Sequence, residues 1–220
     1  ANGVSKLHGV VSRDMWGKYP GICEITSITN AQDFLYWGDE PLYEAKEAKN
    51  DEAFDKRKKH LKKRLFQVVA DQTGKLFDLN VLTIVWARRF AGYKRADLLL
   101  RDKMRFERLL NNPKYPVQII WAGKPYPLDY SAISTFNSLV EESKEQRNMA
   151  VLTGYELALS KLLKQGSDVW LNNPRVPREA SGTSGMTASM NGSVNMSTDD
   201  GWIPEFAKPG ENSFVVPKCD

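Results

Sequence analysis

The sequence predicts an α/β fold in which a doubly wound, parallel β-sheet follows a helical amino-terminal arm. From residue 80 onward, short apolar segments alternate with segments of helical periodicity. This alternation is typical of a parallel sheet covered by helices on both faces. Right-handed crossovers between such strands would place a ligand at the carboxyl ends of the strands.

The composition excludes several classes of function. The chain has 220 residues, 41% of them apolar and 26% charged, and a net charge of +4. These values are ordinary for a globular protein and give little support for nucleic-acid binding. Cys23, Cys219, His8 and His60 form no metal-binding pattern. Without a membrane-spanning run or a signal peptide, we expect a cytoplasmic protein with no nucleic-acid, membrane or metal partner.

Residues 1–79 are expected to form a helical arm. The glycine, proline and aromatic residues from Trp16 to Tyr43 favour irregular structure, and residues 51–70 have the apolar pattern of a helix. The basic run Lys56–Arg64 fits the solvated face of this helix, with a glucan- or nucleic-acid-binding patch as the alternative. A shorter helix is predicted near the start from four residues at helical spacing: Val4, Leu7, Val10 and Val11.

Residues 80–220 are expected to form the sheet and its covering helices. Length and β-branched content predict strands at 81–86, 117–121, 149–152 and 168–171, and Ser213–Val216 also resembles a strand. Helical periodicity predicts helices at 94–111, 131–143, 155–164 and 184–191. The four strands should be parallel and adjacent, so the turns that follow them meet at one edge.

Cations cluster in the turn after the first of these strands. Arg88, Arg89, Lys94 and Arg95 fall within one short loop and helix start. Arginine offers a planar fork to phosphate oxygens and lysine a point charge. Cations at a helix start oppose the helix dipole, and a bound anion would resolve that conflict. Lys124 follows the next strand and adds a further cation at the same edge, although a solvated basic turn is the alternative.

The segment Glu179–Gly192 is rich in glycine and hydroxyl residues. Ser181, Gly182, Thr183, Ser184 and Gly185 precede or begin a helical pattern, so several backbone N–H groups are exposed together. These donors suit a phosphate or a developing anion, whereas a capped helix start in a tight corner is the simpler interpretation. Two prolines in the preceding loop would hold the Glu179 carboxylate in place, where it could accept bonds from sugar hydroxyls.

These segments together resemble the α-glucan phosphorylases, the family of glycogen, starch and maltodextrin phosphorylases, and most closely its bacterial branch. The resemblance covers nearly the whole chain and includes Asn2–His8 and Thr29-Asn30. Its motifs are Ala87-Arg-Arg-Phe-Ala-Gly-Tyr-Lys-Arg-Ala-Asp97, Trp121-Ala-Gly-Lys124, Leu152-Thr-Gly-Tyr155, Gly166-Ser-Asp-Val-Trp-Leu-Asn172 and Glu179-Ala-Ser-Gly-Thr-Ser-Gly-Met186.

The resemblance implies a Rossmann-like carboxyl-terminal lobe of a two-lobed GT-B glycosyltransferase, whose amino-terminal lobe is absent from this chain. It implies retaining phosphorolysis of an α-1,4-glucan to glucose 1-phosphate, and we expect the isolated chain to be inactive. Arg89 and Lys94 would hold the substrate phosphate. Arg88, Lys124 and the turn Thr183–Gly185 would hold the phosphate of pyridoxal phosphate, while Glu179, Ser181, Gly182 and Asn30 would contact the sugar. A homodimer of the full-length protein is compatible with it.

The chain departs from the family at two positions. Thr187 stands where the family has the lysine that binds pyridoxal phosphate, and a hydroxyl cannot form that Schiff base. Ala91 stands where many relatives have a histidine near the sugar. Two alternatives therefore stay open. One is a sugar-nucleotide-dependent retaining transferase of the glycogen-synthase kind, which shares the spacing of Arg89 and Lys94, and the other is an inactive glucan-binding relative.

Overall fold

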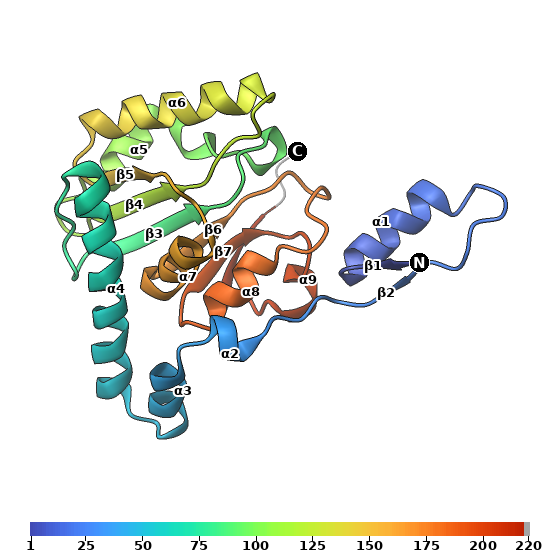
Figure 1. Cartoon of the computed structure of the whole chain (residues 1–220), viewed down its shortest axis with the longest axis horizontal. Coiled ribbons are helices and arrows are strands. Elements are labelled where there is room, and N and C mark those ends of the chain that lie inside the picture. Colours follow the sequence, from blue (N-terminus) through green and yellow to red (C-terminus); the bar gives the residue numbers. More distant parts are fainter. Residues whose placement is uncertain (218–220) are drawn as a thin grey trace.

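The computed structural model describes residues 1–217 and contains a six-stranded, wholly parallel sheet in the order β5-β4-β3-β6-β7-β8 (Figure 1). Its strands are β3 (Leu82–Ala87), β4 (Val117–Ala122), β5 (Met149–Leu152), β6 (Val169–Asn172), β7 (Val194–Thr198) and β8 (Ser213–Val216). The four predicted strands are present, parallel and adjacent, which confirms the doubly wound α/β fold. The strand order reverses between β3 and β6, where such sheets bind ligands.

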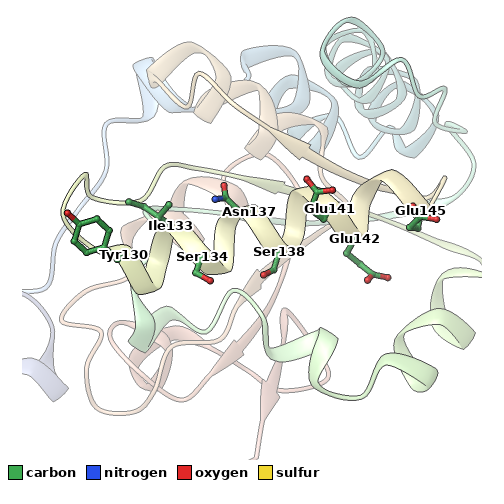
Figure 2. A pocket seen from close by; sticks show the side chains of 8 residues that line it. All are labelled: Tyr130, Ile133, Ser134, Asn137, Ser138, Glu141, Glu142 and Glu145. Atoms are coloured by element: carbon green, nitrogen blue, oxygen red, sulfur yellow. The ribbon is translucent and has the colours of Figure 1, made fainter.

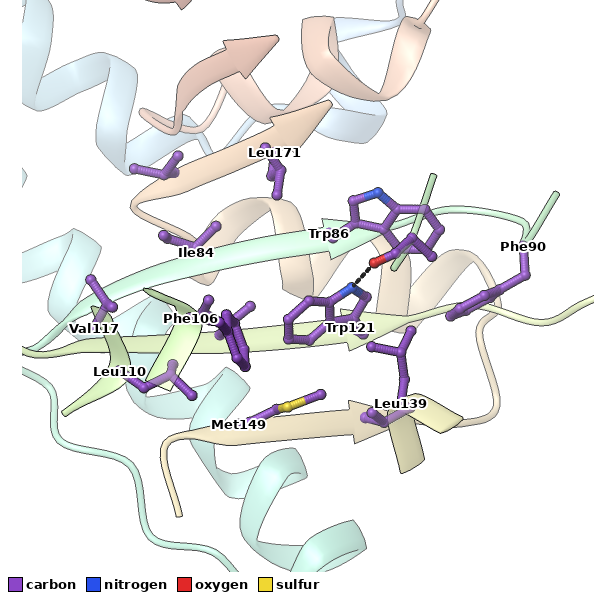
Figure 3. Close-up of a cluster of buried hydrophobic side chains, with 14 of the residues drawn as sticks. Ile84, Trp86, Phe90, Phe106, Leu110, Val117, Trp121, Leu139, Met149 and Leu171 are labelled. Atoms are coloured by element: carbon purple, nitrogen blue, oxygen red, sulfur yellow. Dashed lines mark hydrogen bonds between the residues drawn. The ribbon is translucent and has the colours of Figure 1, made fainter. Parts of the chain in front are cut away.

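One face of the sheet packs on helices that follow β3 and β4. Ile84 and Trp86 of β3 point to this face, together with residues of α5 (Lys103–Leu110) and α6 (Tyr130–Glu145). Figure 3 shows the side chains of this cluster, in which the buried Trp121 indole donates from Nε1 to Ala96 O at 3.1 Å. The indole polar group is therefore satisfied inside an apolar layer.

The opposite face packs on α4 (Asp51–Thr73), α7 (Leu157–Gly166) and α8 (Thr183–Ser189). Val85 and Ala87 of β3 point to this side, since successive side chains of a strand alternate between faces. Leu65 and Val69 of α4 are fully buried against them. The long helix of the expected arm is thus one of the layers that cover the sheet, and the boundary between residues 79 and 80 stays a prediction.

Strand β7 was not foreseen, because its buried positions are polar. Asn195 and Ser197 are 1% and 0% exposed, so the strand lacks the apolar run by which its neighbours were recognised. Asn195 Nδ2 donates to Gly185 O at 3.1 Å and to Ser189 Oγ at 2.6 Å. The buried Asn195 side chain of this strand thus forms hydrogen bonds that hold the glycine-rich helix α8 in place.

The helix predicted at 94–111 is wrong in its first half. Two 3₁₀ turns, η1 (Gly92–Lys94) and η2 (Leu98–Arg101), precede α5. Arg95 separates them with a φ of 52°, in the left-handed region. Its guanidinium donates to Asn173 O at 2.8 Å and Pro174 O at 3.1 Å, so contact with the loop after β6 overrides the local helical pattern.

The basic run on α4 is only partly solvated, which corrects the interpretation of the whole run as an exposed face. Lys62 is 4% exposed and pairs with Asp168 at 2.7 Å. Lys58 Nζ donates to Gln165 O at 2.8 Å and Asn191 O at 2.6 Å, near the ends of α7 and α8. Arg57 forms two hydrogen bonds with buried Asp39. These cations supply donors to carbonyl groups near helix ends and counter-charges to the carboxylates of Asp39 and Asp168.

The amino-terminal region contains more regular structure than predicted. Besides α1 (Lys6–Trp16), β1 (Asn2–Gly3) and β2 (Thr26–Ser27), the structure has α2 (Phe34–Trp37) and α3 (Glu40–Glu47). Asp33 and Asp39 cap these two helices by accepting from the amides of Tyr36 and Leu42. Residues 1–33 project away from the sheet (Figure 1) and are called the arm below. No helix within residues 1–217 is long and apolar enough to cross a membrane.

We predict that Gly166→Ala destabilises the fold. A Cβ atom at Gly166 would lie 2.7 Å from Leu65 Cβ, so α7 and α4 would have to move apart. Overpacking of this kind costs roughly 1–3 kcal/mol of unfolding free energy. Urea unfolding measures the loss, and Gly92→Ala is the control, because a Cβ at Gly92 meets nothing within 4 Å. Equal stability of both variants would contradict the packing described here.

Candidate functional site

The candidate site lies at the carboxyl ends of β3, β4 and β6. The loops after β3 and β4 run side by side, joined by hydrogen bonds from Arg88 N to Ala122 O at 3.0 Å and from Phe90 N to Lys124 O at 3.1 Å. Gly123 permits this approach, since a Cβ there would lie 2.0 Å from Arg88 O. The loop after β6 carries Glu179 to the same place. The sheet therefore brings together the segments that the sequence singled out.

Arg88 is the most deeply buried cation of the site. It is 5% exposed, and its guanidinium carbon lies 5.8 Å from the Trp86 ring centre. Nη2 donates to Ser184 Oγ at 3.3 Å, whereas Nε and Nη1 have no hydrogen-bond partner within the described chain. Burial lowers the pKa of Arg88, while the charge of Glu179 opposes that change. A buried guanidinium with free N–H groups is suited to an anionic ligand.

Glu179 neutralises two cations at once. Its carboxylate accepts from Lys94 Nζ at 3.1 and 2.8 Å, and its Oε2 lies 3.5 Å from Arg88 Nη1, within ion-pair distance. The Glu179 and Lys94 side chains are only 12% and 13% exposed. These charges therefore interact in a poorly hydrated environment, where electrostatic attraction is strong. Glu179 therefore pairs with Arg88 and Lys94, two of the cations that were predicted from the sequence to bind phosphate groups.

Asp200 and Trp202 hold the loop that carries Glu179. Asp200 is 2% exposed and accepts from Glu179 N at 3.0 Å and Gly201 N at 2.8 Å. Burial raises its pKa, and these amide hydrogen bonds counteract the effect. The Trp202 indole donates to Gly182 O at 3.0 Å, and its backbone N–H donates to Ser181 O at 2.9 Å. Neither residue was identifiable from the sequence, because the contacts with Glu179, Ser181 and Gly182 span about twenty residues of chain.

The glycine-rich turn depends on close contacts with its neighbours. Gly182 has a φ of 80°, and a Cβ at Gly185 would lie 2.6 Å from Asn195 Oδ1. Gly185 N already donates to Gly182 O at 3.0 Å, so it is not a free donor. Thr183 and Ser184 begin α8, where the backbone N–H groups have no hydrogen-bond partner within the helix. Both residues are partly exposed, and their amides remain the donors available to a ligand.

Thr187 does not fit a covalently bound pyridoxal phosphate. The residue is 1% exposed, and its hydroxyl donates to Thr183 O at 3.3 Å and Ser184 O at 3.1 Å within its own helix. It carries no amine, and the segment 179–192 contains no lysine. The site thus retains groups that suit a phosphate, in particular Arg88, but lacks the group that would form a Schiff base.

Arg89 and Lys124 lie at the solvent-exposed margin of the site. Both side chains are exposed, and no ion pair involving either is found within residues 1–217. Lys124 lines a hollow of about 470 Å³ together with Gly123 and Tyr155. Tyr155, which was not assigned a role from sequence, donates to Ala87 O at 3.3 Å, and burial raises the pKa of its phenol. Its position in the loop after β5, three residues beyond the end of the strand, was the signal that could have identified it.

The residues that the resemblance assigns to sugar binding lie close together, although Asn30 is far in sequence from the other three. Asn30 of the arm donates from Nδ2 to Ser181 Oγ at 3.0 Å. Ser181 lies beside Gly182 and two residues after Glu179. The structure therefore gathers Asn30, Ser181, Gly182 and Glu179, while the roles assigned to them stay predictions.

A hollow of about 700 Å³ along α6 lies apart from these residues (Figure 2). Its side chains include Glu141, Glu142 and Glu145, and no lysine or arginine lines it. Glu141 and Glu142 pair with Lys144 and Lys103, so the hollow offers a phosphate no excess of positive charge. The cationic edge of the sheet is therefore the better anion site.

Comparison of the sequence with known proteins identifies its family. The model of the carbohydrate phosphorylases matches residues 40–214. The chain belongs to the carbohydrate phosphorylase family. It is 35% identical to maltodextrin phosphorylase of Thermococcus litoralis and 34% identical to glycogen phosphorylase of Mycobacterium tuberculosis, over 98% and 100% of its own length. It is also 53% identical, over 98% of its length, to an uncharacterised protein of Methanocaldococcus jannaschii.

The chain spans only part of these phosphorylase-family relatives. It covers 31% of the Thermococcus litoralis protein, 30% of the Mycobacterium tuberculosis protein and 41% of the Methanocaldococcus jannaschii protein. Membership of the family agrees with the resemblance seen in the motifs around Arg88, Lys124 and Glu179.

We predict that Glu179→Gln destabilises the protein and makes it more responsive to phosphate. Arg88 and Lys94 lose their shared counter-charge, and breaking a buried ion pair costs roughly 3–5 kcal/mol of unfolding free energy. Phosphate can replace the missing charge, so it should raise the melting temperature of the variant more than that of the wild type.

Thermal unfolding with and without phosphate measures both effects. Glu156→Gln is the matched control, because Glu156 is an exposed carboxylate at the same sheet edge. If Glu179→Gln and Glu156→Gln behave alike, Glu179 does not neutralise the two cations.

Proposed function

We propose that this chain is the phosphate-binding lobe of an α-glucan phosphorylase-like glycosyltransferase. The full-length enzyme would transfer a terminal glucosyl unit from an α-1,4-glucan to phosphate and release glucose 1-phosphate with retention. The observation that carries the proposal is the buried Arg88, whose Nε and Nη1 make no hydrogen bond with any described residue and whose counter-charge, Glu179, is shared with Lys94. Family membership supplies the reaction class.

The site residues divide into an anion side and a sugar side. Arg89 and Lys94 would bind the substrate phosphate, with Arg88 and the amides of Thr183 and Ser184 as further donors. In the reaction, a phosphate oxygen bonds to the sugar C1 as the bond from C1 to the glucan oxygen breaks, and a proton passes from the phosphate to that oxygen. Fixed cations in a dry cleft stabilise the charge that develops.

The shared ion pair suggests how the two sides are coupled. In the structure, Lys94 binds Glu179 through both carboxylate oxygens. A phosphate that takes Lys94 would release the Glu179 carboxylate to accept hydrogen bonds from glucose hydroxyls, next to Ser181 and Asn30. Phosphate binding would thereby prepare the sugar side, and each ligand would favour the other.

Thr187 supports a second candidate, a retaining transferase that uses a sugar nucleotide. Such an enzyme would place the diphosphate of its donor against Arg89 and Lys94 and would need no Schiff base. Pyridoxal phosphate, in contrast, would have to bind this chain without a covalent tether. The second candidate is therefore tested alongside the first.

Product analysis separates the two candidates. Full-length protein is incubated with maltoheptaose and phosphate, with pyridoxal phosphate either supplied or omitted, and glucose 1-phosphate is measured. Parallel reactions contain maltoheptaose and a nucleoside diphosphate glucose, with release of the nucleotide as the readout. Formation of glucose 1-phosphate is the expected result. Transfer only from the sugar nucleotide would replace the first candidate by the second, and absence of both reactions would indicate an inactive glucan-binding relative.

We predict that Arg89→Ala weakens binding of phosphate by roughly 1.5–3 kcal/mol, the range for hydrogen bonds to charged groups. Arg89 is exposed at the margin of the site, so the variant should keep the stability of the wild type. Calorimetric titration of the full-length protein with phosphate measures the change. Arg101→Ala is the control, because Arg101 is an exposed arginine that pairs with Asp97 on η2. Unchanged affinity in Arg89→Ala would count against this role.

We predict that the wild-type protein forms no stoichiometric pyridoxyl adduct, whereas Thr187→Lys forms one. The chain has no lysine in the segment 179–192, and a Schiff base needs a primary amine within reach of the carbonyl. Borohydride reduction followed by peptide mass mapping detects the adduct. An adduct on any lysine of the wild-type lobe would overturn the first statement. Failure of Thr187→Lys to gain one would favour a site shaped for the sugar nucleotide.

A further inference from the structure

We infer that Glu205 is a positioning residue for the sugar side of the site. It acts by fixing the arm against the segment 180–181, and so determines where Asn30 lies beside Ser181. The inference rests on the proposed function, because the position of Asn30 matters for binding only if this side of the site contacts a sugar. The contacts themselves are independent of any ligand.

Both carboxylate oxygens of Glu205 hold the arm. Glu205 belongs to the short helix α9 (Ile203–Phe206). Its Oε1 accepts from Lys6 N, and its Oε2 accepts from Thr29 Oγ1, each at 2.8 Å. Lys6 is the first residue of α1, where the backbone N–H has no partner in the helix and a negative charge is favourable. One side chain therefore ties the start of α1 to the segment that follows β2.

The Glu205 carboxylate binds two neutral donors, the Lys6 amide and the Thr29 hydroxyl, and no cation among the described residues. No lysine, arginine or histidine side chain forms an ion pair with Glu205 anywhere in residues 1–217. A surface carboxylate of ordinary kind would be solvated or paired with a mobile cation. Glu205 instead bridges two segments that are separated by more than twenty residues of chain, which is the arrangement expected of an anchor.

The arm then reaches the site through two further hydrogen bonds. Ser5 is fully buried, and its hydroxyl accepts from His8 N at 3.1 Å while it donates to Ala180 O at 2.7 Å. Asn30 N donates to Val4 O at 3.1 Å, which joins the two ends of the arm. Asn30 Nδ2 in turn donates to Ser181 Oγ. The arm thus meets the chain within two residues of Glu179.

The segment around Glu205 forms hydrogen bonds with the loop after Glu179 as well as with the arm. Trp202 binds Ser181 O and Gly182 O through its backbone and indole N–H groups, and Glu205 follows it by less than one helical turn. Residues 202–205 therefore set the distance between the loop and the arm. Loss of the Glu205 carboxylate should loosen the arm while Trp202 keeps the loop in place.

The test compares Glu205→Ala and Glu205→Gln in the full-length protein, with Glu211→Ala as the control. Glu211 is an exposed carboxylate six residues away that contacts only Lys208 among charged groups of the described chain. Amide hydrogen exchange of residues 2–30 reports the anchor directly. Calorimetric titrations with maltoheptaose and with inorganic phosphate report the two sides of the site separately.

We expect Glu205→Ala to accelerate exchange at the Lys6 and Asn30 amides. Its affinity for maltoheptaose should fall about tenfold, the effect of losing one hydrogen bond at the site, while its affinity for phosphate stays unchanged. Glu205→Gln keeps one acceptor oxygen and should lie between the wild type and Glu205→Ala. The double variant Glu205→Ala/Asn30→Ala should bind maltoheptaose no more weakly than Asn30→Ala alone, because Glu205 acts through Asn30.

Each contrary outcome is distinguishable. Unchanged exchange in Glu205→Ala overturns the anchor. Additive losses in the double variant, or a parallel fall in phosphate affinity, overturn the positioning role and indicate a general effect on folding. If the wild type itself does not bind maltoheptaose, the proposed function fails, and the positioning role fails with it, although accelerated exchange would still establish the anchor.

Discussion

Burial of the Arg88 guanidinium is the constraint on which the rest of the site depends. A cation this deeply enclosed needs a counter-charge, and Glu179 supplies it at 3.5 Å while also binding Lys94. Glu179 can do so only because Asp200 and Trp202 hold its loop, and because the glycines of the following turn let the chain approach β7. The adjacency of β3 and β6 makes this meeting possible, since it places the two loops at one edge.

The sequence was sufficient for the features that depend on local pattern. The strands near Val85, Ile120 and Ala150 are apolar runs bounded by polar turns, and parallel topology then determines that their carboxyl ends meet. Features that depend on distant contacts were not predictable in this way. Arg95 breaks a helical pattern by binding carbonyls of the loop after β6, and Asn195 lies in a strand whose buried residues are polar.

The candidate site likewise combines residues that local sequence pattern identifies with residues that only distant contacts reveal. Arg88, Lys94 and Glu179 were identified from their residue types and from their positions after strands. Asp200 and Glu205 were missed, because each acts through hydrogen bonds to segments far away in sequence, and neither stands in a motif that signals such a contact. Local chemistry thus identified the groups that would meet a ligand, whereas the groups that hold them in place required the structure.

Family membership and Thr187 together define what is unusual here. The chain has a cationic edge and a glycine-rich turn, and it has the Thr187 hydroxyl where the resemblance to the family implies a lysine. The central claim is that this edge binds an inorganic anion by exchanging it for Glu179. A crystal structure of the full-length protein grown in phosphate tests that claim most directly. The account predicts phosphate bound to Arg89 and Lys94, with Lys94 released from Glu179. An intact pair of Lys94 and Glu179, with phosphate absent or bound elsewhere, would contradict it.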